Sequence, residues 1–183
     1  MQSTISRRSA VAAVAILGLT AMQPAHAQAT QAGTAKLDDP TIIAIFDAAN
    51  TWDIETGGIA AKRGSTKEVR DFGAMLVRDH TMVRQQGRDL VKKLGVTPTP
   101  PRDFAMAKDH AAAVKKLRSL RGKAFDRAFL QHEVAFHKAV IDAVNTSLLP
   151  ALKNPEARDL VTKVAPAFQA HMMAAQNMLD KEK

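Results

Sequence analysis

Ionisable side chains interrupt the apolar face of a helix that the sequence predicts over residues 122–149. At about 100° per residue, Glu133 and Asp126 lie within roughly 40° of His137, on the face that should enter the core. His132 lies about 140° away by the same count and points to the other side. A helix face that combines imidazole and carboxylate groups is typical of a metal site or of a buried hydrogen-bond network.

The other long predicted helices carry ionisable groups on their apolar faces as well. Glu55 interrupts the first face. His80, flanked by Asp79, interrupts the second, and His171 interrupts the last. Burying such groups is unfavourable unless they are paired or bind an ion. Four helices that share this feature favour a common site in the middle of a bundle.

The height of each group along its helix indicates which of them can meet. His80, His137 and His171 each lie close to the midpoint of their predicted helix, so we expect them at one level. Glu55 is displaced from that level by roughly 9 Å at about 1.5 Å per residue, which makes it the weakest ligand. The sequence therefore predicts a mononuclear metal site, whose candidate residues are His80, His137, His171, Glu133, Asp79 and Glu55.

Two other interpretations of these residues stay open. In the first, the carboxylates only fix the tautomers of structural histidines. In the second, two histidines hold a haem near Met172, Met173 and Met178, although methionine at helical spacing is more typical of a core. If a metal is bound, imidazole with carboxylate suits zinc, copper, iron or nickel equally well, and the sequence does not choose among them.

Helix-start and helix-stop signals divide the chain into segments that position these residues. Asp38 or Asp39 is expected to cap a first helix that ends at Gly64, and its seam residues are predicted to be Ile45, Ala48, Trp52, Glu55 and Ile59. A second helix over 66–94 is expected to start after Ser65 and to end at Gly95.

The second half of the chain begins with a proline-rich loop over residues 97–101. Asp103 is expected to cap a shorter helix that ends near Leu120, and the helix over 122–149 follows it. The last helix starts at Asn154 and Pro155, and Pro166 should kink it. Four long helices, one short helix and no strand pattern predict an all-α, ferritin-like four-helix bundle with an additional short crossover helix.

The N-terminal segment is predicted to be a secretory signal peptide over residues 1–27. Arg7 and Arg8 precede a short apolar run, and Ala27 ends a small-x-small cleavage pattern. Ser9 and the alanine after it are not the residues expected for twin-arginine export, so general secretion is favoured. We expect residues 28–38 to be a flexible leader and residues 39–183 to form the bundle, in the periplasm or cell envelope.

Composition limits the partners of this 183-residue chain. Its formal net charge is +8, but the basic residues are interspersed with acids, and aromatic residues make up only 4%. Both features argue against nucleic acid and favour an anionic membrane surface or an envelope partner. There is no cysteine, which excludes disulfides and thiolate metal sites. The sequence does not indicate an oligomeric state or a substrate.

Several motifs together resemble one bacterial family. They are the run Leu76–His80, the run Leu117–Leu130 with His137 after it, and Ala165-Pro166 with His171-Met172. This combination resembles the domain-of-unknown-function 4142 family, over roughly Pro40 to Leu179. The resemblance implies a ferritin-like bundle in an exported protein, often labelled a predicted outer-membrane protein, and it implies no settled activity.

The spacing departs from that of ferritin-like di-iron sites. Those sites use Glu-x-x-His pairs, whereas Val77 stands three residues before His80 and Phe168 stands three before His171. Glu133 and His137 are four residues apart. This spacing argues against a di-iron site. We therefore expect an exported helical bundle that binds a single metal ion through its core histidines. The alternative is a non-enzymatic envelope or stress-related protein whose core histidines are only structural.

Overall fold

The computed structural model describes residues 37–102 and 104–181, which form helices and the connections between them, with no strand among them. Its elements are α1 (Asp39–Arg63), α2 (Lys67–Leu94), α3 (Ala105–Ser119), α4 (Gly122–Ala143), the π-helix η1 (Val144–Leu148), α5 (Leu149–Ala151) and α6 (Pro155–Lys181). The predicted signal peptide, most of the predicted leader and the predicted Asp103 cap lie outside the described residues.

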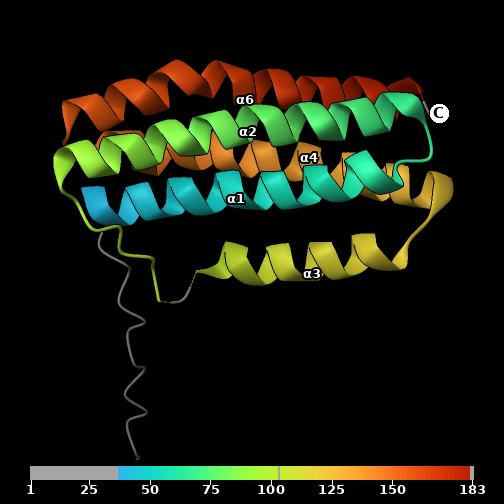
Figure 1. Cartoon of the computed structure of the whole chain (residues 1–183), viewed down its shortest axis with the longest axis horizontal. Coiled ribbons are helices and arrows are strands. Elements are labelled where there is room, and N and C mark those ends of the chain that lie inside the picture. Colours follow the sequence, from blue (N-terminus) through green and yellow to red (C-terminus); the bar gives the residue numbers. More distant parts are fainter. Residues whose placement is uncertain (1–36, 103, 182–183) are drawn as a thin grey trace, which may run out of the picture. The chain divides into compact units, whose positions relative to one another are not determined.

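Four long helices lie side by side as a bundle (Figure 1). The most extensive contacts join α1 to α2 and α4 to α6, and smaller ones join α2 to α6 and α1 to α4. The order around the bundle is therefore α1, α2, α6, α4. The crossover helix α3 contacts α1 and α4 from outside the bundle (Figure 1). The predicted all-α four-helix bundle with a short crossover helix is confirmed.

Short polar contacts fix the ends of the helices. The Asp38 side chain accepts a hydrogen bond from the Thr41 amide at the start of α1, and Gly95 ends α2 with a φ of 63°. The cap of α2 is Thr66 and not Ser65, because the Thr66 side chain accepts from the Val69 amide. The Ser65 amide and hydroxyl instead donate to the Asp126 carboxylate of α4. Asp126 therefore anchors the α1–α2 turn.

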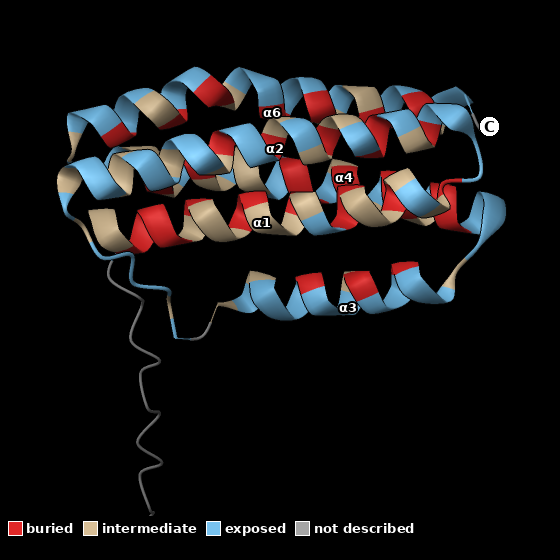
Figure 2. Cartoon of the chain, in the orientation of Figure 1, coloured by how far each residue is buried: buried red, intermediate tan, exposed pale blue. Residues whose placement is uncertain are grey.

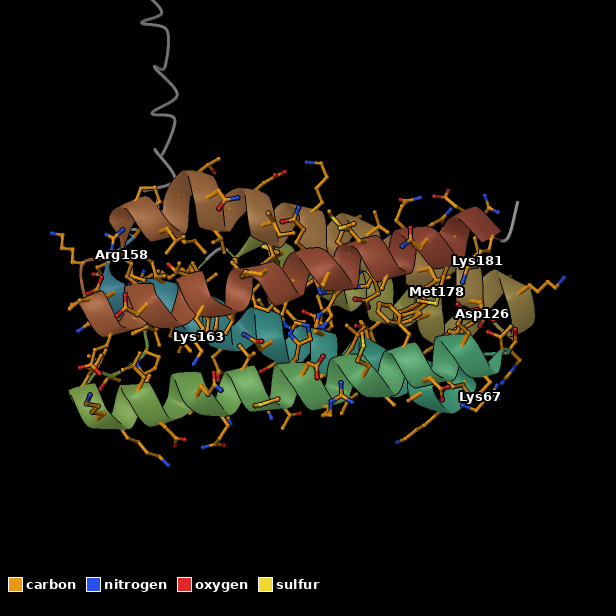
Figure 3. The ribbon with its side chains drawn as sticks, turned by 90° about the horizontal axis from the view of Figure 1, so that it is seen from above. Lys67, Asp126, Arg158, Lys163, Met178 and Lys181 are labelled. Atoms are coloured by element: carbon orange, nitrogen blue, oxygen red, sulfur yellow. The ribbon has the colours of Figure 1, made fainter. Side chains whose placement is uncertain are left out.

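Asp126 is also remote from the other ionisable groups of its helix face. Figure 3 shows it at the end of the bundle that carries Lys67 and Lys181. Its side chain is fully buried, and its two oxygens accept bonds from Ser65 and the Thr66 amide.

The buried face of α1 differs from the predicted seam. Its buried residues are Thr41, Ile42, Ile43, Ala44, Phe46, Ala49, Asn50, Asp53, Thr56, Gly57 and Ala60. Two glycines explain part of this register, because a Cβ on Gly57 would lie 2.8 Å from the carbonyl oxygen of Gly73 in α2. The backbones of α1 and α2 therefore approach closely over small residues, and Glu55 is turned away from the core.

The end of α4 also differs from the prediction. The helix was expected to continue to Leu149, but its last stretch, η1, is a π-helix, and Pro150 lies in the first turn of the short α5. In α6, by contrast, the helix continues through Pro166.

The core consists of two apolar clusters with a polar layer between them. One cluster contains Phe46, Val83, Val144, Val161 and Phe168. The other contains Leu76, Phe125, Phe129, Leu130 and Ala175. In α2, α4 and α6 the buried histidine stands between members of the two clusters in the chain. The buried faces of the helices turn inward (Figure 2).

None of the helices in the described part of the chain is long and apolar enough to span a membrane.

Candidate metal centre

The structure brings three histidines together in the polar layer. His80 of α2, His137 of α4 and His171 of α6 are 2%, 1% and 4% exposed. Their ring centroids lie 5.1 to 5.6 Å apart, and one ring nitrogen from each lies within 4.8 Å of the others. The midpoint estimate from the sequence thus places these three side chains correctly.

Hydrogen bonds on the outer side of two rings determine where their protons lie. His80 Nδ1 is 2.9 Å from Asn50 Oδ1, and His137 Nδ1 is 3.0 Å from the backbone carbonyl oxygen of Glu133. An amide or carbonyl oxygen only accepts, so each Nδ1 carries the proton and donates it. In both rings Nε2 is then unprotonated and carries a free lone pair, and neither Nε2 has a hydrogen-bond partner among the described residues.

The third ring is oriented by a carboxylate at the rim of the layer. His171 Nε2 donates to Asp79 Oδ2 at 3.1 Å, and Asp79 Oδ1 in turn accepts from Arg78 Nε at 2.8 Å. The inward atom, His171 Nδ1, is buried and has no partner in the described structure. Each ring therefore presents one unpartnered nitrogen.

The surroundings keep the three imidazoles neutral. Burial, followed by the neighbouring histidines, lowers the pKa of His80 to about 2. Burial also lowers the pKa of His137 to about 3, with a further contribution from His171. The pKa of His171 is lowered by burial, although Asp79 opposes the shift. Neutral imidazole is the form that binds a metal, so all three nitrogens are available as ligands at neutral pH.

Two carboxyl groups complete the layer. Asp53 of α1 is 3% exposed, and Glu133 of α4 is fully buried. Asp53 Oδ1 lies 3.9 Å from His137 Nε2, while Asp53 Oδ2 lies 3.5 Å from His80 Nδ1. Glu133 Oε2 lies 3.5 Å from His137 Nδ1, and Glu133 Oε1 accepts from Thr56 Oγ1 at 2.8 Å. Asp53 Oδ1 and Glu133 Oε2 have no hydrogen-bond partner among the described residues.

Burial makes this carboxyl pair difficult to ionise. It raises the pKa of Asp53 well above its ordinary value, and the charge of Glu133 adds to the shift. Burial also raises the pKa of Glu133 to about 7, although the hydrogen bond from Thr56 opposes it. Two adjacent carboxyl groups in a dry site favour sharing a proton or binding a cation.

The layer therefore draws on all four long helices. Asp53 comes from α1, His80 from α2, His171 from α6 and His137 from α4, in the order in which the helices surround the core. Asp53, Glu133 and His137 also form a second group with ligand atoms within 4.8 Å of one another. Three neutral nitrogens with a nearby carboxylate suit a first-row transition metal ion.

The structure separates the predicted candidates into three places. His80, His137, His171 and Glu133 lie in the layer, and Asp79 lies at its rim with its side chain 24% exposed.

Glu55 lies outside the layer, with its side chain 41% exposed. Its carboxylate is 2.9 Å from His110 Nε2 and accepts a bond from Arg118 at 2.9 Å, so it holds α3 against α1. Trp52 supports the same contact, because its ring stacks on His110 at 5.3 Å. The placement of Glu55 in the core seam was wrong, since the large residues Trp52 and Ile59 were assigned to the buried face of α1.

Sequence reasoning missed Asn50, Asp53 and Thr56. These residues are three positions apart on α1 and all face the core, with exposures of 1%, 3% and 0%. A polar series at three-residue spacing was the available signal. The predicted buried face of α1 followed its large side chains, and this polar series lies on a different face of the helix.

Fold and site together define a class: an all-α bundle whose core holds a layer of three histidines and two carboxyl groups. The chain matches the family described as Domain of unknown function (DUF4142) over residues 22–178, and it belongs to that family. The family resemblance noted from the motifs is thus confirmed.

A solved structure supports the fold independently. The crystal structure of a DUF305 fragment from Deinococcus radiodurans matches with a TM-score of 0.67 and 16% sequence identity. The match covers 76% of this chain and 93% of that one. At this identity the likeness concerns the fold alone. A comparison with curated proteins gives no significant match.

Proposed function

We propose that this protein binds a single transition metal ion through His80, His137 and His171. The observation that carries the proposal is the set of three buried ring nitrogens, one on each histidine, that lack a hydrogen-bond partner in the described part of the chain. Leaving a buried polar atom unpaired costs about 1–3 kcal/mol. A cation between the rings would satisfy all three lone pairs at once.

The hydrogen bonds around the rings support a metal site over a purely structural network. In a self-contained network both nitrogens of a buried histidine have partners. Here Asn50, the Glu133 carbonyl and Asp79 hold only the outer nitrogens. Such outer partners are typical of metal-binding histidines, because they fix the tautomer and the ring orientation.

Asp53 is the best-placed fourth ligand. Its Oδ1 has no hydrogen-bond partner among residues 37–102 and 104–181 and lies 3.9 Å from His137 Nε2. Ligand atoms that each lie about 2.1 Å from one tetrahedral ion are themselves roughly 3.4 Å apart. Asp53 forms a group within 4.8 Å with His137 and Glu133, so it would have to move toward the other two histidines to complete the site. Glu133 then supports Asp53 and His137 from the side of α4. Zinc, copper, iron and nickel all suit this donor set.

The proposed setting is the cell envelope. The support is the basic start, the short apolar run and the small residues before Gln28, which together have the pattern of a cleaved signal peptide. The absence of cysteine means that the bundle needs no oxidation to fold in that compartment.

Metal analysis tests the proposal. Untagged protein is exposed separately to zinc, copper, iron and nickel salts, dialysed and analysed by mass spectrometry of its metal content. We expect at least one of these metals to bind with one ion per chain, and His137→Ala to lose it. His132→Ala is the matched control, because His132 lies on the same helix outside the layer. Wild-type protein that retains none of the four metals, or unchanged binding in His137→Ala, would contradict the proposal.

A further inference from the structure

A small cavity ends at one side of the histidine layer. Its volume is about 30 Å³. Its walls are mainly apolar and come from α1, α4, η1 and α6, including Phe46, Ala49, Val140, Val144, Leu148 and Phe168. Met106 of the crossover helix α3 also lines it. Its polar lining residues belong to the layer or its support: Asn50, Asp53, His80 and His137.

Three buried atoms with no hydrogen-bond partner among the described residues belong to side chains that line this cavity. They are Asp53 Oδ1, His80 Nε2 and His137 Nε2. These are the atoms that an ion would use in the proposed function. Once an ion occupies them, the space that remains is bounded almost entirely by hydrocarbon. The cavity would then lie beside the metal ion.

The local backbone helps to make this space. Val144 and Leu148 belong to the π-helix η1, where the regular α-helical pattern of α4 is interrupted. Ala49 and Ala143 contribute small side chains to the lining, where larger residues would fill the volume. A π-helical turn carries an extra residue relative to an α-helix and is frequent at functional sites.

Size and polarity restrict what this space can hold. A volume near 30 Å³ excludes organic metabolites, which need pockets of about 300 Å³ or more. Anions would lose their hydration against apolar walls and would meet the nearby carboxyl groups of Asp53 and Glu133. A water molecule needs two to four polar partners, and these lie only at the end that the ion would take.

We propose that the cavity binds a small uncharged molecule of about two heavy atoms, such as dioxygen, beside the metal ion. The role of the cavity in bringing a ligand to the metal rests on the proposed metal function. Binding of the molecule in the cavity does not rest on it, because the apolar walls exist without the ion.

Dissolved dioxygen is itself a probe, because it is paramagnetic and accelerates the relaxation of nearby methyl groups. The protein is labelled with ¹³C at its methionine methyl groups and studied in metal-free and zinc-loaded form, under oxygen and under argon. We expect the Met106 methyl group to show at least threefold more relaxation enhancement than that of Met178, which is buried in the other core cluster. Zinc is diamagnetic and adds no relaxation of its own.

Cavity-filling variants separate bound oxygen from oxygen in bulk solvent. Ala143→Leu and Ala49→Leu should each lower the enhancement at Met106, which is half-buried and would keep only the part due to oxygen in bulk solvent. Ala139→Leu, on the exposed side of α4, should leave it unchanged. If either filling variant does not fold, the other carries the test.

Equal enhancement at Met106 and Met178 would overturn the cavity proposal, and so would enhancement that is undiminished in the filled variants. Enhancement in the metal-free protein that vanishes on zinc loading would also overturn it, because the cavity would then be closed beside the ion. A protein that takes up no metal refutes the proposed function instead, and the metal-free measurement still decides the cavity.

Discussion

At the scale of single residues, the site depends on side chains that decide where protons lie. Asn50 presents an acceptor to His80 Nδ1, so the inward Nε2 of that ring must be the lone pair. The Glu133 carbonyl and Asp79 do the same for the other two rings. None of these partners needs to contact an ion to control how well it is bound.

Replacing Asn50 therefore tests this control. Asn50→Ala leaves all three histidines in place but removes the acceptor that fixes the His80 tautomer. We expect metal affinity to fall by about 10- to 100-fold, as is usual when an orienting partner is lost. Competition with a chelator measures the affinity. Thr51→Ala, the adjacent residue on α1, is the control and should bind as the wild type does.

The lowered histidine pKa values predict acid sensitivity of the metal-free protein. The pKa of an unfolded histidine is near 6.5. Burial lowers the pKa of His80 to about 2 and that of His137 to about 3 in the folded chain. The unfolded chain then binds protons that the folded chain does not. The stability that depends on these two neutral histidines is therefore fully present above pH 6.5 and is lost as the pH falls from 6.5 toward 3. Denaturant unfolding at a series of pH values measures this.

Two variants check which residues make the free energy of unfolding depend on pH. His80→Gln should make the loss of stability shallower, by up to about 1.4 kcal/mol per pH unit. Glu133→Gln should make the loss steeper below pH 7. The pKa of Glu133 is raised to about 7, so protonated Glu133 stabilises the fold most at low pH. This stabilisation declines as the pH rises from 4.5 to 7, which is opposite to the effect of the histidines. Equal slopes in all three proteins would refute the assignment.

At the scale of elements, the register of α1 decides which residues enter the core. Capping signals and the 3.6-residue period predicted α1 and α2 closely, because Gly64 and Gly95 end them as expected. The histidines were placed correctly because each stands between large apolar residues of its own helix. Asp53 was missed because neighbouring helices, and not size alone, select the buried face. The π-helix η1 has no local signal in the sequence.

The glycine contact between α1 and α2 makes that selection testable. A Cβ on Gly73 would lie 2.6 Å from the Gly57 carbonyl oxygen and 2.7 Å from the Ala61 amide nitrogen. Gly73→Ala should therefore destabilise the protein by about 1–3 kcal/mol, because rigid backbone atoms must move. Gly58→Ala is the control. Its Cβ would meet nothing closer than 3.9 Å, so helix propensity should stabilise the protein by up to about 1 kcal/mol. Chemical denaturation compares the two.

At the scale of the whole molecule, an ion in the layer would link the stability of the bundle to metal concentration. A ligand that binds only the folded state adds about 2.7 kcal/mol when its free concentration is 100 times its Kd. We expect the unfolding midpoint to rise with added metal and to fall on chelation. His171→Ala should abolish this dependence while leaving a folded bundle, because both apolar clusters remain. A midpoint insensitive to metal in the wild type would contradict the linkage.

The two hairpins divide the ligands of this layer between them. The α1–α2 hairpin supplies Asp53 and His80, and the α4–α6 pair supplies His137 and His171, with the proline-rich loop and α3 as the covalent connection. A chain cleaved within that loop would consequently yield two fragments, each with an incomplete coordination set. Reassociation of the fragments through the two apolar clusters would then be strengthened by the ion, as in a split reporter whose halves share a ligand.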